Sequence, residues 1–169
     1  LTLNYDEKEY TNTSAQGVNI SNYKANTATA EVSGVVRDMS PGGALATYSV
    51  QATQGNIDLN GSLSQLSDTA KTEGHFAKIK ASATVLQPLT SELSLYGSLT
   101  AQRANKNLDS SEKISLGGMT GVRAYPTGEG SGSDGEIATV EMRYNLNEST
   151  MVSAFYDWGR VQLMHDANF

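Results

Sequence analysis

The chain has 169 residues, of which 38% are hydrophobic, and it carries a formal net charge of −6 without any cysteine. An acidic chain with no basic face lacks what phosphate binding requires, so we expect no nucleic-acid partner, and the lack of cysteine excludes a disulfide framework and thiolate metal sites. Only three prolines stand beside abundant Ser, Thr, Asn and Gly, a composition that favours all-β structure with polar faces.

Apolar and polar residues alternate with a period of two in six segments of roughly ten residues, close to the ~9–11 that a tilted strand needs to cross a bilayer. In each segment the apolar face carries no charge, whereas the opposite face is polar. A soluble β-sandwich with its polar faces in water would show the same periodicity. The six predicted strands cover residues 28–37, 44–52, 77–85, 92–102, 138–146 and 152–159.

The links between the predicted strands alternate strictly between short and long. This alternation is typical of bacterial outer-membrane barrels, which have short periplasmic turns and long extracellular loops, and it favours a membrane barrel over the soluble sandwich. The short links are 40–43, 87–91 and 146–150, and the long links are 6–27, 56–74 and 103–135.

The last long link contains SLGGMTGVRAYPTGEG, in which Arg123 stands between apolar and aromatic neighbours, Val122 and Tyr125. Such an arginine becomes buried only if a carboxylate meets it, because an unpaired buried guanidinium is strongly unfavourable. Asp157, on the polar face of the last strand, is the natural candidate, and Glu141 on the preceding strand is the alternative. From the residues alone, a solvent-exposed Arg123 without a carboxylate partner remains an alternative.

Other motifs predict no catalytic chemistry. The glycine-rich run at 128–135 is not followed by a Gly-Lys-Ser/Thr signature, so we expect no nucleotide. His75 and His165 are isolated, which predicts no metal site, and no further cofactor is indicated. Because the sequence shows neither a nucleophile elbow nor a close pair of carboxylates, we do not expect an enzyme.

Three stretches carry a resemblance to a known family. They are NLDSSEKISLGG (107–118), LGGMTGVRAYP (116–126) and, beyond a strand that carries Glu141, FYDWG (155–159). In this order and spacing they resemble the transporters of two-partner secretion, the haemolysin-activator type of outer-membrane protein within the barrel-assembly superfamily.

The resemblance implies roles for particular residues. The long link would fold back into the barrel, and Arg123 at its tip would pair with Asp157. The family usually has a glycine after this arginine, where this chain has Ala124, so we expect a slightly different backbone at the tip. The loop-tip motif would be Val122, Arg123, Ala124 and Tyr125, and the strand motif Phe155, Asp157 and Gly159.

The resemblance also implies an architecture. Residues 1–169 would form six to seven strands of a sixteen-stranded antiparallel transmembrane β-barrel, the C-terminal domain of such a transporter, with the inward-folded loop at about 103–135. Two periplasmic modules would lie outside this stretch.

The function implied is an outer-membrane pore, surrounded by lipid, that exports an unfolded partner protein passively and without nucleotide or cofactor. Two alternatives remain at this stage: an assembly insertase of the same superfamily, and a soluble β-sandwich binding module. The side chains expected to line the lumen are Lys78, Lys80, Glu92, Gln102, Glu141 and Arg143.

Overall fold

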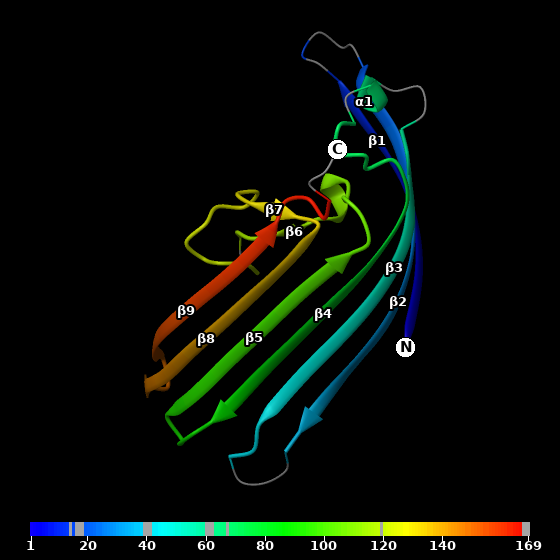
Figure 1. Cartoon of the computed structure of the whole chain (residues 1–169). Coiled ribbons are helices and arrows are strands. Elements are labelled where there is room, and N and C mark those ends of the chain that lie inside the picture. The colour runs from blue at the N-terminus through cyan, green and yellow to red at the C-terminus, as the bar shows by residue number, and fades with distance from the viewer. Residues whose placement is uncertain are drawn as a thin grey trace.

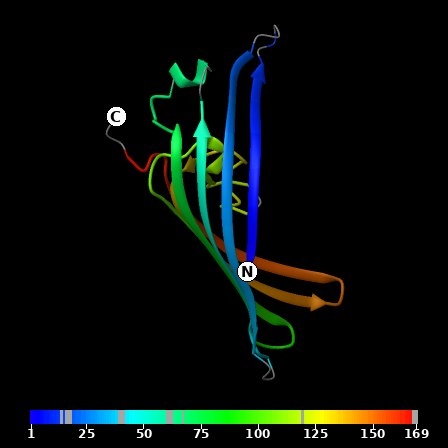
Figure 2. The ribbon, with the colours of Figure 1, turned by 90° about the vertical axis from the view of Figure 1, so that its right-hand side faces the viewer.

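The structure, a computed structural model, describes residues 1–13, 15, 19–38, 42–59, 63–66, 68–118 and 120–166. Its main feature is one antiparallel sheet of seven strands in the order β1-β2-β3-β4-β5-β8-β9, which curves as a single layer (Figures 1 and 2). The strands are β1 (Thr2–Thr13), β2 (Asn19–Arg37), β3 (Leu45–Asp58), β4 (Gly74–Pro88), β5 (Leu93–Ala104), β8 (Asp134–Asn147) and β9 (Thr150–Gln162).

The strand register keeps polar residues on one face of the sheet. Gln51 lies directly opposite Lys80, and Lys80 lies directly opposite Gln102, so three neighbouring strands place their polar side chains together. Because side chains in a strand alternate between the two faces, one matched pair of residues determines the face on which every other residue of the paired strands lies. We call this polar side the inner face and the opposite side the outer face.

The outer face is apolar and uncovered. Val50, Leu99 and Val140 lie in its middle and are 46%, 51% and 53% exposed, while Tyr156 near one end is 70% exposed. A soluble domain rarely leaves so large an apolar area in water, because each buried Å² stabilises by about 25 cal/mol. Among the described residues, no sheet packs on this outer face, and the only other sheet is the two-stranded one within a link on the inner side, so the sandwich alternative is wrong.

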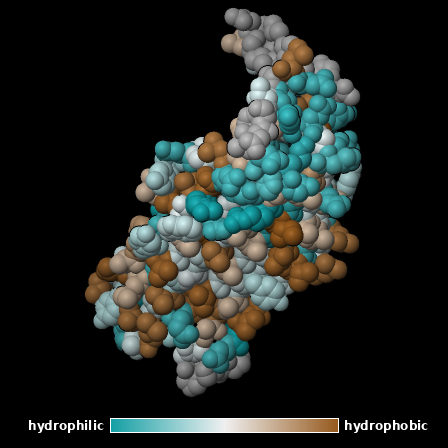
Figure 3. All heavy atoms as spheres, viewed as in Figure 1, coloured by the Kyte–Doolittle hydropathy of each residue, from teal (hydrophilic) through white to brown (hydrophobic). Residues whose placement is uncertain are grey.

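The links from β2 to β3, from β4 to β5 and from β8 to β9 lie at one end of the sheet, and the long links from β3 to β4 and from β5 to β8 lie at the other (Figure 1). Hydrophilic side chains gather over the end with the long links, whereas apolar ones are frequent along the lower part of the same view (Figure 3). One long link contains the short helix α1 (Leu63–Leu66). Across the described ranges, no helix has the length and apolarity needed to span a membrane.

The expected long link at 6–27 is wrong. Residues of β1 pair with β2 from Thr2 opposite Glu31 to Thr13 opposite Asn19, so this stretch is a hairpin of two long strands. The alternation is lost there because the outer face becomes polar beyond the apolar band, as at Glu9 opposite Lys24. The inner face carries Ala25, Tyr10 and Tyr23 in or against a buried cluster, so the contrast of an apolar outer and a polar inner face disappears. All six predicted strands are present in the structure, and each is longer than expected.

The link between β5 and β8 spans residues 105–133 and has structure of its own. It contains the 3-10 helix η1 (Ser110–Glu112) and a small two-stranded sheet of β6 (Ile114–Ser115) and β7 (Ser131–Gly132). At its start, Leu108 belongs to a buried cluster with Ile57 and Phe76 from the inner face of β3 and β4. This cluster fixes the beginning of the link over the upper end of the sheet.

A lysine on the outer face should be far worse than one on the inner face. In the full-length protein in a bilayer, Val50→Lys should lower the free energy of unfolding by roughly 2–4 kcal/mol, because lipid cannot hydrate the ammonium group. The matched Ser49→Lys should change it little, since Ser49 faces inward and donates a hydrogen bond to Glu31. Denaturant unfolding would measure both, and equal losses would contradict the assignment of the faces.

Candidate functional site

The apolar residues of the long link pack against the inner face of the last two strands. Ile114 and Val122 of the link form a buried cluster with Ile137 of β8, and Leu116 and Val161 pack at its margin. The polar inner face thus carries an apolar patch where the link crosses it. This packing explains why the loop sequence contains apolar residues.

The tip of the link is a tight turn that carries Arg123. The amide of Tyr125 donates to the carbonyl oxygen of Val122 at 3.1 Å, which closes the turn. Asp157 then accepts three hydrogen bonds from Arg123: from the backbone amide at 3.1 Å, from Nε at 2.9 Å and from Nη2 at 3.1 Å. Backbone and side chain of Arg123 are therefore both held by one carboxylate.

Glu141 is a second partner of the same guanidinium. Nη1 of Arg123 donates to Glu141 Oε2 at 2.7 Å, and Arg143 Nε donates to Glu141 Oε1 at 2.7 Å. The sequence offered Asp157 and Glu141 as alternatives, whereas the structure brings both to Arg123. Asp157 makes the greater number of bonds.

The ring of Phe155 lies against the guanidinium group of Arg123. Its ring centroid lies 3.6 Å from Cζ of Arg123, so the guanidinium stacks on the aromatic face. In the register of β8 and β9, Phe155 is directly opposite Glu141, and Asp157 is directly opposite Thr139. Glu141 thus lies across from the ring and Asp157 lies next to it on the same face of β9, and the hydroxyl of Thr139 donates to Asp157 Oδ1 at 2.9 Å.

We call Arg123, Asp157, Glu141, Phe155 and Arg143 the Arg123 cluster. Its two arginines and two carboxylates balance in charge, and the side chains of Asp157 and Glu141 are only 4% and 9% exposed. Hydrogen bonds to Asp157 first, and to Glu141 second, raise the pKa of the Arg123 guanidinium above its ordinary value, so it stays charged. A paired, neutral cluster can be desolvated at much lower cost than a lone charge.

The alanine at position 124 fits the tip. Among the described residues, Lys71 has a positive φ outside glycine, and Ala124 does not, so the turn needs no glycine there. The expected difference from the backbone of family members with glycine at this position stays a prediction. Ala124 and Tyr125 are both exposed.

Gly159 provides room for the link. A Cβ atom at this position would lie 2.5 Å from Leu116 Cδ1 and 2.9 Å from Val122 Cγ2, so these side chains of the link would have to shift. The three inward residues of the strand motif thus have separate functions: Phe155 stacks, Asp157 pairs and Gly159 leaves space. This division follows from their spacing of two, which places all three on one face.

The beginning of the link is anchored separately from its tip. Lys78 of β4 forms an ion pair with Glu112 at 2.8 Å, with both side chains largely buried. The Gln102 side chain, 2% exposed, donates to the carbonyl oxygens of Glu112 and Ser133. These two predicted inner-face residues therefore hold the loop rather than line an open space.

A second set of contacts ties the link to its neighbours at the upper end. Asn107 donates to the carbonyl oxygens of Ala70 and Asp166 and accepts from the amide of Asp166. Asp134 accepts from the amide of Ala104 at 2.7 Å and lies 2.9 Å from Nδ1 of His165. Sequence reasoning did not assign roles to Asn107, Glu112 or Asp134; the only signal was their place in or near the family-like stretch.

The remaining predicted inner-face residues are more open. Lys80 is exposed and borders a crevice beneath the link. Glu92 lies in the turn before β5, where its carboxylate accepts hydrogen bonds from the Thr90 and Ser91 hydroxyls. Glu92 therefore sits at the short-link end and not in the wall itself. Within the described part of the chain, no group of three metal-ligating side chains occurs.

The fold and this site define a class of protein. A curved antiparallel sheet with an apolar outer face, a polar inner face and a long link fastened inside is part of a membrane β-barrel with an inward-folded loop. The model of the family described as haemolysin secretion/activation protein ShlB/FhaC/HecB matches residues 1–168. The chain belongs to this family of two-partner secretion transporters of the Gram-negative outer membrane.

Curated relatives cover a shorter stretch. The heme/hemopexin transporter protein HuxB of Haemophilus influenzae strain Rd is 35% identical over 75 residues, which is 42% of this chain and 13% of that protein. HuxB of strain 86-028NP is 38% identical over 65 residues, covering 36% of this chain and 12% of that protein. The matched stretch is thus about an eighth of the relatives' length. No solved structure matches.

Removing the charge of Asp157 should free the loop tip more than removing that of Glu141. Asp157→Asn weakens three bonds from Arg123 and should destabilise the full-length protein by about 1–3 kcal/mol, a range lowered for the partial exposure of Arg123. Glu141→Gln leaves the bonds to Asp157 in place. Limited proteolysis within the link should therefore be faster in Asp157→Asn; equal cleavage rates would argue against Asp157 as the main anchor.

A side chain at position 159 should displace the link without touching any charge. Gly159→Val places methyl groups where Leu116 and Val122 pack, so the link should leave the inner face and become accessible to protease. Ser153→Val is the matched control, because Ser153 is exposed on the same face of β9 and borders neither residue. Protection of the link that persists in Gly159→Val would show that the packing tolerates the extra volume.

Proposed function

We propose that this chain forms part of the wall and the inner loop of a pore that exports an unfolded partner protein across the outer membrane. The single observation that carries the proposal is the Arg123 cluster, which fastens a long loop to the inside of the wall in a chain of this family. The whole protein's activity lies beyond the stretch described, so the export step itself is inferred from family membership.

In this proposal the short links face the periplasm and the long links face the exterior. Family membership and the rule of short periplasmic turns support that orientation. The partner would pass along the inner face, and two polar crevices of about 380 and 350 Å³ lie between the link and the wall. One lining combines hydroxyls with the paired charges of the Arg123 cluster, and the other combines hydroxyls and the Gln51 amide with Lys80 and Lys113; such dispersed or already paired groups would bind a passing chain only weakly.

Transport would be passive in this scheme, driven by folding of the partner outside. An unfolded chain offers no fixed surface, so a wall of dispersed polar side chains suits it better than a deep specific pocket. The loop must then yield space when the partner enters. The loop has two separate attachments, its beginning near Lys78 and Glu112 and its tip at the Arg123 cluster, and in this scheme the tip would be released while the beginning stays in place.

The assembly-insertase alternative has less support. The matching family model describes secretion and activation, and the curated relatives are described as transporters of heme/hemopexin. An insertase needs a wall that opens sideways toward lipid for its substrate. No contact in the described residues favours such an opening over passage through the lumen.

The test is a double-mutant cycle on secretion by the full-length transporter. Arg123→Ala and Asp157→Ala should each reduce export of the partner sharply, and the double variant should export no less than Arg123→Ala, because either single change already removes the pair that holds the loop tip. Export would be measured as partner protein in the medium relative to transporter in the outer membrane. Additive losses would refute a single shared function for this pair, and unchanged export in every variant would refute the proposal.

A further inference from the structure

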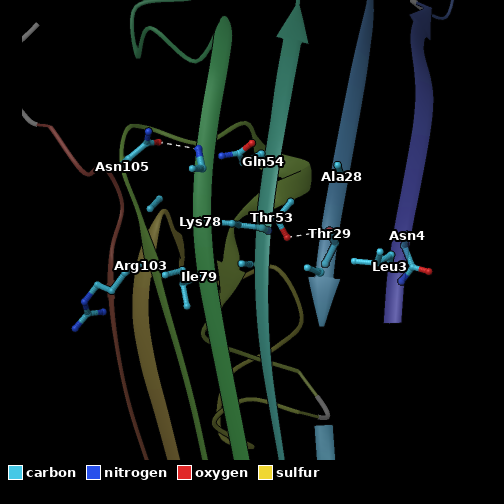
Figure 4. A pocket seen from close by; sticks show the side chains of 14 residues that line it. Leu3, Asn4, Ala28, Thr29, Thr53, Gln54, Lys78, Ile79, Arg103 and Asn105 are labelled. Atoms are coloured by element: carbon cyan, nitrogen blue, oxygen red, sulfur yellow. Dashed lines mark hydrogen bonds between the residues drawn. The ribbon is translucent and has the colours of Figure 1, made fainter. Parts of the chain in front are cut away.

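The outer face is not uniformly bulky. Near the end with the long links, alanines replace the large side chains on β2 to β4: Ala30 lies directly opposite Ala52, and Ala28 and Ala77 lie on either side of Gln54. A depression of about 760 Å³ lies over these positions (Figure 4). Small residues on neighbouring strands thus create a hollow in the lipid-facing surface.

The walls of the depression are apolar. Leu3 stands on β1 at one side and Ile79 on β4 toward the other (Figure 4), and they are 73% and 57% exposed. The volume lies within the ~300–1,000 Å³ typical of sites for small molecules. In a membrane this hollow faces hydrocarbon, so an acyl chain is the group whose burial it favours.

Arg103 places a positive charge at the edge of the depression. Arg103 lies directly opposite Ile79, and Figure 4 shows it beyond Ile79 on the side away from Leu3. Its Nη1 donates to the carbonyl oxygen of Gln102, and its Nη2 pairs with Glu136. A guanidinium has five N–H donors, so donors remain beyond these two among the described contacts.

The charge around Arg103 favours an anion. Glu136, its partner, lies directly opposite Arg160 on β9, so two arginines flank one carboxylate on the outer face. The other cation at the depression, Lys78, is directed inward to Glu112 and is not part of this group. A planar guanidinium with spare donors matches the geometry of a phosphate.

We propose that the depression binds one acyl chain of a phosphorylated, multiply acylated glycolipid of the outer leaflet, with Arg103 contacting the phosphate. This inference rests on the orientation proposed above, which places the long links and therefore Arg103 at the outer leaflet. The bound lipid would fix β1 to β4 at the level where the loop is anchored from inside.

The experiment titrates the purified full-length transporter in detergent with bisphosphorylated lipid A and counts bound copies by native mass spectrometry. Wild type should retain one copy tightly. Ala52→Phe, which fills the hollow, and Arg103→Gln, which removes the cation, should each weaken binding at least about tenfold. The controls are Ala83→Phe, on the outer face outside the hollow, and Arg37→Gln, at the short-link end; both should bind like wild type.

Equal affinity in the hollow variants and their controls would overturn the proposal and leave only unspecific lipid contact. Lipid A without phosphates should bind wild type as weakly as the intact lipid binds Arg103→Gln; equal binding of both lipids to wild type would overturn the role of Arg103. Since Arg103→Gln adds no volume, it remains informative if Ala52→Phe folds poorly.

Secretion measured in the same variants separates this inference from the proposed function. Arg123→Ala should lose export and keep its lipid, whereas Arg103→Gln should lose its lipid and keep the Arg123 cluster. If Arg123→Ala loses export, but Ala52→Phe and Arg103→Gln bind lipid A as tightly as their controls, the lipid site is refuted and the proposed function is not.

Discussion

The register of the seven strands is the constraint on which the other features depend. A bilayer offers no partner for a free backbone N–H or C=O, so strands that cross it must pair along their length. Once paired, a period of two decides which side chains meet lipid and which meet the interior. A shift by one residue between β8 and β9 would turn Asp157 and Phe155 toward lipid and abolish the Arg123 cluster.

The inner loop combines two kinds of interaction that need each other. Ile114, Leu116 and Val122 bury apolar surface against the wall, and this burial removes water from the neighbouring Asp157 and Glu141. Desolvated carboxylates would be costly alone, but Arg123 and Arg143 supply matching charges at hydrogen-bond distance. The apolar contacts therefore make the ion pairs stronger, and the ion pairs make the apolar contacts specific for one position of the loop.

The sequence was misleading where the strands extend beyond the apolar band. In the second half of β1 and the first part of β2, the outer face is polar and Tyr10, Tyr23 and Ala25 pack on the inner face, so no apolar-outward alternation marks residues 6–27 as strands. Their pairing comes from backbone hydrogen bonds, which leave no trace in the pattern of side chains. The roles of Asn107 and Asp134 were equally invisible, because each depends on segments far away in the sequence, such as the stretch ending at Asp166.

Sequence alone determined the all-β class, the two-faced strands, the alternation of most links and the family, since these rest on local periodicity and on short motifs. It also indicated that Arg123 needs a carboxylate, because burial of a lone guanidinium is too costly. Only the tertiary structure decided that Asp157 and Glu141 share that arginine above Phe155, and that Gly159 makes room for Leu116. Those facts depend on the register between strands and on the path of a long loop, which no local pattern encodes.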